Sequence, residues 1–206
     1  MKINLMNLFD GYVRNYHSFR LTVDHGRHSF TMTEIEYFSR LGSMLGLDTY
    51  TEDTCNRTYR PMDLTWWGDY RTEDESWHHF VLHLERENHM HKDEETLDKL
   101  FAQREYVPEN VIGIMSVPNR DRIDELVKIA QEKKIIENSL LIFHTYSLGR
   151  KRGYPDEVHA YLLEKNQGMK HKMAFVSEVA GTLFMHFEPR SELIAALEDT
   201  KMEPSR

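Results

Sequence analysis

The stretch His79-Phe80-Val81-Leu82-His83-Leu84-Glu85-Arg86-Glu87-Asn88 decides the fold. An apolar run of this length, bounded by charge, predicts a buried β-strand, and residues two apart along a strand point to the same face. Glu85 and Glu87 are therefore expected to share a face. Carboxylates that lie close together repel one another, so the pair indicates either a bound cation or a catalytic role, unless both acids lie past the end of the strand in solvent.

A second predicted strand precedes this one and carries a single acid, Asp63, in the sequence Arg60-Pro61-Met62-Asp63-Leu64-Thr65-Trp66-Trp67. The segment from Gly68 to Ser76 is acidic and turn-like, which favours a hairpin between the two strands. Antiparallel pairing would bring Asp63 within reach of Glu85. Three carboxylates would then converge at one end of a sheet. Alternation along the strand places either Trp66 or Trp67 in the core, and leaves the other able to stack on a base.

A helix is predicted before these strands. Thr33 and Glu36 form a capping box, and apolar residues at helical spacing continue to Gly46. Glu34 leans toward the apolar stripe of this helix, which makes it a candidate fourth acid. An acid in a first helical turn can equally serve to stabilise the helix dipole.

The remaining elements alternate between helices and strands. Apolar runs at 111–117 and 140–146 flank a helix at 120–134, and a strand, helix, strand series implies a right-handed parallel crossover. The other expected elements are helices at 4–20, from about Asp93 to before Pro108, at 156–165 and at 192–197, short strands at 47–51, 173–179 and 182–187, and a basic loop at 149–153.

These elements predict an α/β fold with a mixed central sheet flanked by helices. We expect one domain over residues 1–206, with a core at about 30–147, an N-terminal helix at 4–20 and a mixed C-terminal extension at 148–206. Hydrophobic residues make up 40% of the chain, and no apolar run approaches the roughly 20 residues that span a membrane. The N-terminus lacks a signal-peptide pattern and Cys55 is the single cysteine, so we expect a cytoplasmic protein.

The net charge of −8 argues against a protein that coats nucleic acid by bulk attraction. The acidic excess lies in residues 1–110, which hold 12 Lys and Arg against 20 Asp and Glu. Residues 133–172 have a basic excess. An acidic centre beside a basic rim suits a site that binds a divalent metal and a polyanion, although scattered solvated charges are the commoner explanation.

The order of elements resembles the PD-(D/E)xK nuclease superfamily, whose restriction-endonuclease-like core has a helix, three strands, a helix and a strand. The resemblance covers roughly residues 30–118. Pro61-Met62-Asp63 stands for the first half of the motif and Glu85-Arg86-Glu87 for the second. The sequence departs from the motif at Glu87, where the superfamily usually has Lys.

The resemblance implies a metal-dependent nuclease that acts on DNA more readily than RNA, and it leaves a homodimer open. Asp63 and Glu85 would hold Mg²⁺ or Mn²⁺ with the backbone carbonyl of Arg86, while Glu87 would bind a second ion or accept a proton from water. Glu34 would complete the acidic set, and Lys92 or Lys99 would supply the missing positive charge. The residues expected to contact nucleic acid are Arg150, Lys151, Arg152 and Lys92.

Two alternatives accompany this hypothesis. A degenerate motif is also typical of an inactive nuclease fold that serves as a binding or interaction module. The histidines His83, His89 and His91 lie near the motif and leave a transition-metal site open, but their spacing matches no zinc signature, so hydrogen-bonded or exposed histidines are the favoured interpretation.

Overall fold

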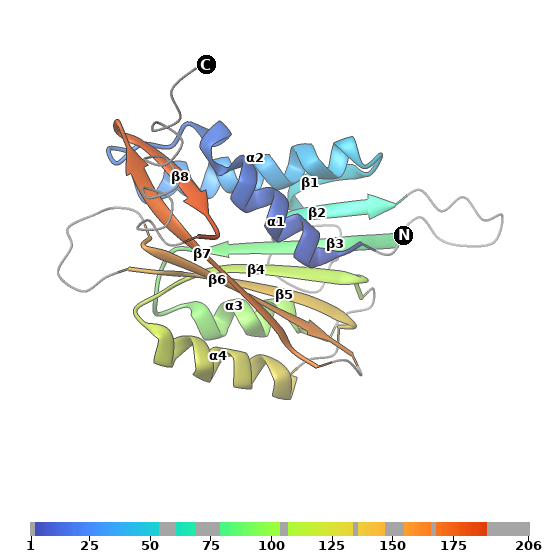
Figure 1. The fold of residues 1–206 in the computed structure, drawn as a ribbon. Helices are drawn as coiled ribbons and strands as arrows, with labels where there is room; N and C mark the ends of the chain where they lie inside the picture. The colour runs from blue at the N-terminus through green and yellow to red at the C-terminus, as the bar shows by residue number, and fades with distance from the viewer. Residues whose placement is uncertain are drawn as a thin grey trace, which may run out of the picture.

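The computed structural model describes residues 3–53, 61–68, 79–103, 107–133, 136–146, 155–165 and 168–188. The described residues form a mixed α/β fold in three layers, with helices on both faces of one eight-stranded sheet (Figure 1). The helices are α1 (Leu5–Asn15), α2 (Arg27–Met44), α3 (Asp93–Leu100) and α4 (Arg120–Lys133), with a short 3-10 helix, η1 (Tyr16–Phe19), after α1. The strands are β1 (Asp48–Asp53), β2 (Met62–Gly68), β3 (His79–Glu87), β4 (Asn110–Val117), β5 (Asn138–Thr145), β6 (Glu157–Glu164), β7 (Lys170–Val179) and β8 (Thr182–His186).

The strands lie in the sheet in the order in which they occur in the chain, from β1 to β8. The pairs β3·β4 and β4·β5 are parallel, whereas all the other neighbouring pairs are antiparallel. Helices α3 and α4 make the two crossovers between the parallel strands, and both cover the same face. The predicted mixed sheet, the β2–β3 antiparallel pair and the parallel crossover are therefore confirmed.

Two hydrophobic cores lie between the sheet and the helices, one on each face of the sheet. One core lies between α1, α2 and the sheet, and it includes Phe9 and Phe38. The other lies beneath α3 and α4 and includes Leu97 and Leu126. Strand β4 contributes to both, because even-numbered residues such as Ile112 face α1 and α2 while odd-numbered ones face α3 and α4.

Two sequence-based boundaries differ from the structure. Helix α2 begins at Arg27 with Gly26 as its N-cap residue, so Thr33 lies inside the helix and forms no capping box there. Residues 157–164 form strand β6 instead of the predicted helix. Its side chains are buried on both faces, and a short run buried all round has the same apolar pattern as a buried helix.

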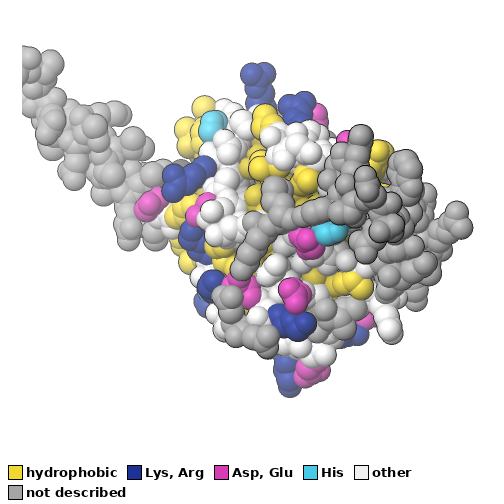
Figure 2. Space-filling view, turned by 90° about the vertical axis from the view of Figure 1, so that its right-hand side faces the viewer, with side chains coloured by type: hydrophobic (Ala, Val, Ile, Leu, Met, Phe, Trp, Pro, Cys, Tyr) yellow, Lys and Arg dark blue, Asp and Glu magenta, His cyan; other side chains and the backbone are white. Residues whose placement is uncertain are grey.

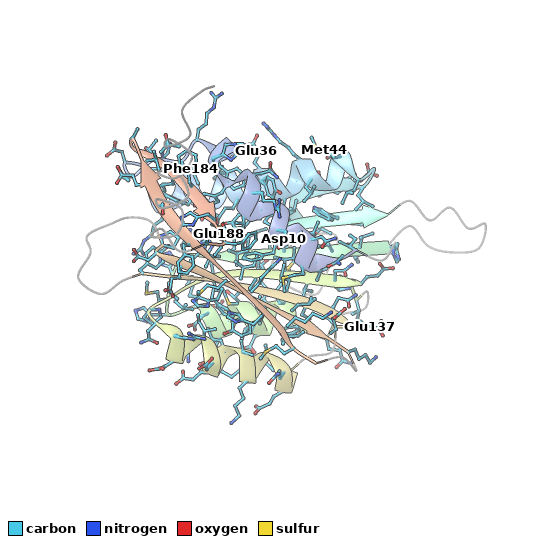
Figure 3. All side chains as sticks on the ribbon, in the orientation of Figure 1. Asp10, Glu36, Met44, Glu137, Phe184 and Glu188 are labelled. Carbon is cyan, nitrogen blue, oxygen red and sulfur yellow. The ribbon has the colours of Figure 1, made fainter. Side chains whose placement is uncertain are left out.

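The C-terminal strands extend the same sheet. Strand β6 pairs with β5 over its whole length, and β7 and β8 follow as antiparallel neighbours. Helix α1 packs across this part of the sheet, where Asp10 forms an ion pair with Lys172 of β7 (Figure 3). The predicted helix at 192–197, the loop at 149–153 and Cys55 lie outside the described residues.

Gly42 is the position where α2 packs directly onto the sheet. A Cβ atom built on Gly42 would lie 2.7 Å from Nε1 of Trp66, a fully buried side chain of β2. The indole ring is rigid and enclosed, so it cannot move away without disturbing the core. The glycine therefore sets the distance between the helix and the sheet.

We expect Gly42→Ala to lower the free energy of unfolding by about 1–3 kcal/mol, because overpacking outweighs the roughly 1 kcal/mol that alanine gains in helix propensity. Urea denaturation measures the change. Gly168→Ala is the control, since a Cβ there would meet nothing within 4 Å and should leave stability unchanged or slightly raised. A more stable Gly42→Ala protein would contradict the close packing of α2 on β2.

Candidate functional site

Two groups of polar side chains lie on opposite faces of the sheet near the C-terminal end of β3. Residues 85 and 87 pair with Gly113 and Met115 of β4, and so face α3 and α4. Arg86 pairs with Ile114 and faces α1 and α2. The two predicted acids of β3 therefore share a face, as alternation along the strand requires, and Arg86 lies on the other one.

The first group, here called the acid pair, consists of Asp63 and Glu85. The backbone N–H of Asp63 donates to Oε1 of Glu85 at 3.0 Å, and the backbone N–H of Arg86 donates to Oδ2 of Asp63 at 2.7 Å. Each carboxylate thus binds a backbone amide of the neighbouring strand just beyond the last paired residues, Leu64 and Leu84. The convergence of Asp63 and Glu85 that the sequence predicted is present.

Lys99 of α3 reaches the acid pair, with its Nζ 2.7 Å from Oε1 of Glu85. Its side chain is 16% exposed and that of Glu85 is 8% exposed, so the contact is largely shielded from water. Of the two lysines that were expected to supply positive charge here, Lys99 is therefore the one that contacts the acid pair. Lys92, the other candidate, is exposed and lies at the N-terminus of α3.

The environment of the acid pair disfavours two negative charges. Burial, and then the charge of Asp63, raises the pKa of Glu85 to about 7, although Lys99 acts in the opposite direction. Burial also raises the pKa of Asp63, against the hydrogen bond from the Arg86 amide. A carboxyl group that titrates near neutral pH beside a lysine is the kind of perturbed group that occurs in active sites.

Glu87 lies on the same face but has a different partner. Its Oε1 accepts a hydrogen bond of 2.7 Å from the backbone N–H of His89. Its charge contributes to the raised pKa of Asp63. Among the residues that the structure describes, no group of three or more His, Cys, Asp or Glu side chains could hold a metal ion. The three acids therefore do not form a closed metal centre.

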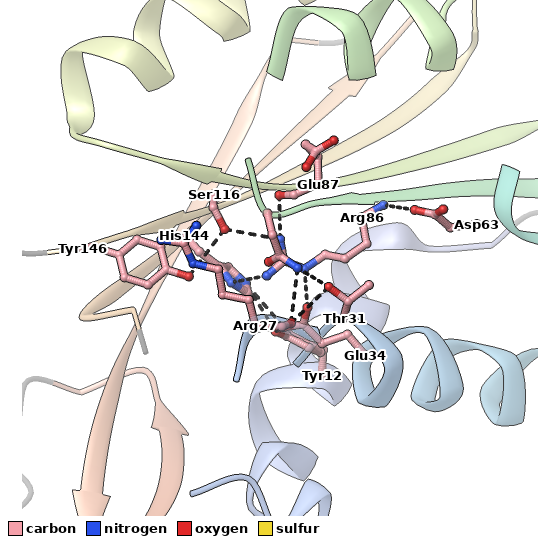
Figure 4. Close-up of polar contacts among 11 residues, drawn as sticks. Tyr12, Arg27, Thr31, Glu34, Asp63, Arg86, Glu87, Ser116, His144 and Tyr146 are labelled. Atoms are coloured by element: carbon pink, nitrogen blue, oxygen red, sulfur yellow. Dashed lines mark hydrogen bonds and ion pairs between the residues drawn. The ribbon is translucent and has the colours of Figure 1, made fainter. Parts of the chain in front are cut away.

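Glu34 belongs to the second group and not to the acid pair, which corrects its expected place beside Asp63 and Glu85. It is fully buried inside α2, and its Oε2 accepts a hydrogen bond from Nε of Arg86 (Figure 4). The hydroxyl of Tyr12 donates to Oε1 of Glu34 at 2.6 Å. The sequence placed Glu34 on the inner stripe of its helix correctly, but could not say which face of the sheet that helix covers.

The second group, here called the Arg86 network, connects α1 and α2 to the face of the sheet that they cover. Besides Glu34, the guanidinium donates to the backbone carbonyl of Glu87 at 2.7 Å, and to Nδ1 of His144 and the hydroxyl of Ser116 at longer range. Ser116 and His144 lie near the C-terminal ends of β4 and β5. Figure 4 shows these side chains converging from α1, α2 and the parallel strands.

The donors in the network assign the tautomer of His144. Because arginine can only donate, Nδ1 of His144 accepts from Arg86, so its Nε2 carries the proton and faces the hydroxyl of Tyr12 at 3.3 Å. Burial, supported by the charge of Arg86, lowers the pKa of His144 to about 4. Burial alone would raise the pKa of Glu34, but Arg86, His144 and the hydrogen bond from Tyr12 together lower it below its ordinary value. The network is therefore one buried ion pair with neutral partners.

A sequence signal for this network exists. Arg86 is the only charged residue of β3 on its face, and a strand buried on both sides cannot leave a guanidinium without an anion. Glu34 is the acid on the inner stripe of the helix that covers that face. The expectation that Glu34 completes the acidic set with Asp63 and Glu85 took account of the acids but not of this buried arginine.

The expected nucleic-acid contacts are only partly described. Arg150, Lys151 and Arg152 lie outside the described residues. On the face drawn in Figure 2, basic and acidic side chains are intermingled. Trp66 is buried and Trp67 half-buried, as alternation predicted, and His83 is buried.

No helix in the described ranges combines the length and apolar character that a membrane span needs. The chain matches no protein-family model, no curated protein and no solved structure.

Removing the charge of Glu34 should be far more costly than removing the charge of its neighbour Glu36. We expect Glu34→Gln to lower the free energy of unfolding by about 3–5 kcal/mol, because it leaves Arg86 buried without a counterion. Glu36→Gln is the matched control from the same helix, since Glu36 and its partner Arg40 are exposed, and should cost at most about 1 kcal/mol. Equal losses in the two variants, measured in urea, would contradict this account.

The raised pKa of Glu85 gives stability a defined pH dependence. Between the ordinary carboxyl pKa of 4.5 and about 7, the folded state keeps a proton that the unfolded state has lost, so the free energy of unfolding falls as pH rises. Glu85→Gln should show a smaller fall between pH 5 and 8 than the wild type. Glu132→Gln, an exposed change on α4, should follow the wild-type curve, and so would Glu85→Gln if the carboxyl titrated normally.

Proposed function

We propose that the chain is a divalent-metal-dependent phosphodiesterase that cleaves nucleic acid, with DNA as the preferred substrate, and that its core is restriction-endonuclease-like. The observation that carries the proposal is the acid pair of Asp63 and Glu85 on neighbouring strands with Lys99 against it. The motif resemblance requires two such acids and a lysine in one place. Here the lysine comes from the helix after the motif strand.

The donor chemistry of the acid pair suits Mg²⁺ or Mn²⁺. One oxygen of each carboxylate is used in the contacts described above, and within the described ranges Oδ1 of Asp63 and Oε2 of Glu85 make no hydrogen bond. Mg²⁺ is commonly held by one or two carboxylates, with waters and substrate phosphate completing its shell, so a third protein ligand is not required. Such an ion supplies polarisation of the scissile phosphate and activation of water.

The protein side chains have separate tasks in this proposal. Asp63 and Glu85 bind the ion, and Glu87, half-buried on the same face, accepts the proton of the attacking water. The ammonium of Lys99 stabilises the charge that develops on the phosphate. A protein of net charge −8 needs a local positive surface to bind the nucleic-acid backbone. In this proposal that surface is formed by Arg150, Lys151, Arg152 and Lys92.

A second function follows from the same contacts. Lys99 already neutralises Glu85, and both carboxylates bind backbone amides at the end of the β2–β3 pair. In that case the acid pair is a structural cap of the two strands, and the chain is an inactive nuclease fold that binds a partner. The two functions differ in whether an ion and catalysis depend on Asp63.

Cleavage of single- and double-stranded DNA in Mn²⁺ should depend on the acid pair and on Lys99. We expect Asp63→Asn and Glu85→Gln to abolish Mn²⁺ binding in calorimetry together with cleavage. Lys99→Met should lower kcat by about 10²–10³ while leaving Mn²⁺ binding, because both carboxylates remain and the ammonium that stabilises the charge on the phosphate is lost. Lys128→Met, an exposed change on α4, is the matched control.

The outcome separates the two functions. Cleavage that survives Asp63→Asn would contradict the nuclease proposal. Absence of cleavage in the wild type, with DNA or another partner still bound after Asp63→Asn, would favour the binding module.

A further inference from the structure

A serine and a histidine lie in contact on the hairpin of β7 and β8, away from both groups described above (Figure 1). Ser177 of β7 and His186 of β8 are diagonal neighbours, because Ser177 pairs with Phe184 and His186 pairs with Phe175. The residues that alternate with them pack in the core beneath α1 and α2, so both side chains point to the opposite face. Strands β4, β5 and β6 separate β7 from β3, and the pair is therefore independent of the acid pair.

The contacts of His186 fix the positions of its protons. Its Nδ1 contacts the backbone carbonyl of Glu188, and its Nε2 lies 2.7 Å from Oγ of Ser177. A carbonyl can only accept, so Nδ1 carries the proton of the neutral ring and Nε2 presents a lone pair. The hydroxyl of Ser177 therefore donates to Nε2 of His186.

This arrangement is that of a serine with its general base. An activated nucleophile has a base within about 2.6–3.2 Å, and a third group orients that base. The carbonyl of Glu188 is the orienting group here. Oγ of Ser177 accepts no hydrogen bond from the described residues, so a lone pair is available for attack. The alternative is a hydrogen bond that only ties β8 to β7.

Aromatic side chains flank the hydroxyl on the same face. Phe175 precedes Ser177 by two residues and Phe184 lies opposite it, and both rings are half-buried. The ring of Phe175 lies beside that of His186, with centroids 6.1 Å apart. Ser177 itself is 7% exposed. A reagent therefore reaches the hydroxyl over apolar surface, which suits an apolar acyl chain better than a charged group.

We propose that Ser177 is a nucleophile that accepts the acyl group of an activated ester or thioester, with His186 as its general base. As Oγ bonds to the acyl carbon, its proton passes to Nε2 of His186, and the bond from that carbon to the leaving oxygen or sulfur breaks. The proton then goes to the leaving group, which departs as an alcohol or a thiol.

The surroundings of Ser177 limit the acyl donors that can react. Stabilising the charge that develops on a carbonyl oxygen needs further hydrogen-bond donors. Within the described part of the chain, His186 is the one side chain bonded to the Ser177 hydroxyl. We therefore expect reaction only with carbonyls that carry a good leaving group.

Acylation by p-nitrophenyl butyrate tests the site in the full chain. We expect a single butyryl group on Ser177, located by peptide mass spectrometry, together with release of p-nitrophenol. Ser177→Ala should abolish this labelling, and His186→Gln should slow it by about 10²–10⁴-fold through loss of the general base. Asp63→Asn should be labelled like the wild type, which separates this site from the proposed nuclease centre.

Two exposed residues provide matched controls. Ser43→Ala removes a hydroxyl whose partners are the carbonyl of Ser39 and the hydroxyl of Thr49. His28→Gln removes an imidazole at the start of α2. Both variants should be labelled on Ser177 at the wild-type rate.

The measurement on the folded wild type decides the proposal without any variant. Absence of the Ser177 adduct in the wild type would overturn it, and so would an adduct that forms equally fast in His186→Gln with its circular dichroism unchanged. The pair would then be a structural hydrogen bond between β7 and β8.

Discussion

Arg86 links the two faces of the sheet, and both polar groups depend on it. Its backbone N–H binds the carboxylate of Asp63 on the side of α3 and α4, while its guanidinium binds Glu34 on the side of α1 and α2. The backbone and the side chain of this one residue thus make polar contacts on opposite faces of the sheet. A one-residue shift in the register of β3 would move the guanidinium to the opposite face of the sheet and separate Asp63 from Glu85.

The cost of burying a guanidinium explains the composition of the α1 and α2 layer. The guanidinium is almost completely shielded from water, which costs free energy. That cost is offset only if the ion pair and the remaining hydrogen bonds have good geometry. Glu34 supplies the anion, and Tyr12 supports it from α1. The remaining hydrogen bonds of the guanidinium go to the backbone carbonyl of Glu87, to His144 and to Ser116. The first helix is therefore held to the sheet by a polar contact as well as by its apolar side.

Much of the fold could be predicted because alternation and helical spacing are local properties of the sequence. The faces of Glu85 and Glu87, the burial of Trp66 and the strand order around Asp63 all follow from period two and from short connections. The prediction of a helix at 156–165 was wrong because β6 is buried on both faces. Its apolar pattern therefore has no period that distinguishes a strand from a helix.

The place of Glu34 could not be read from local pattern, because it depends on which face of the sheet α2 covers. The two crossovers put α3 and α4 on one face and leave the other to α1 and α2. That choice places Glu34 opposite Glu85, and makes it a partner for Arg86. Counting acids alone therefore overestimates the acidic set, because Glu34, one of the four candidate acids, pairs with the buried guanidinium of Arg86.

The contrast between the two groups gives a reason to look for chemistry at the acid pair. In the Arg86 network the single anion and the single cation balance, and the neighbouring histidine is neutral. At the acid pair one lysine faces two carboxylates, with Glu87 nearby, so negative charge remains in excess at a largely buried position. Burial raises the pKa of both carboxyl groups, the charge of a neighbouring acid adds to this effect, and a bound cation would act against it. The dication of the proposed function would relieve this electrostatic cost.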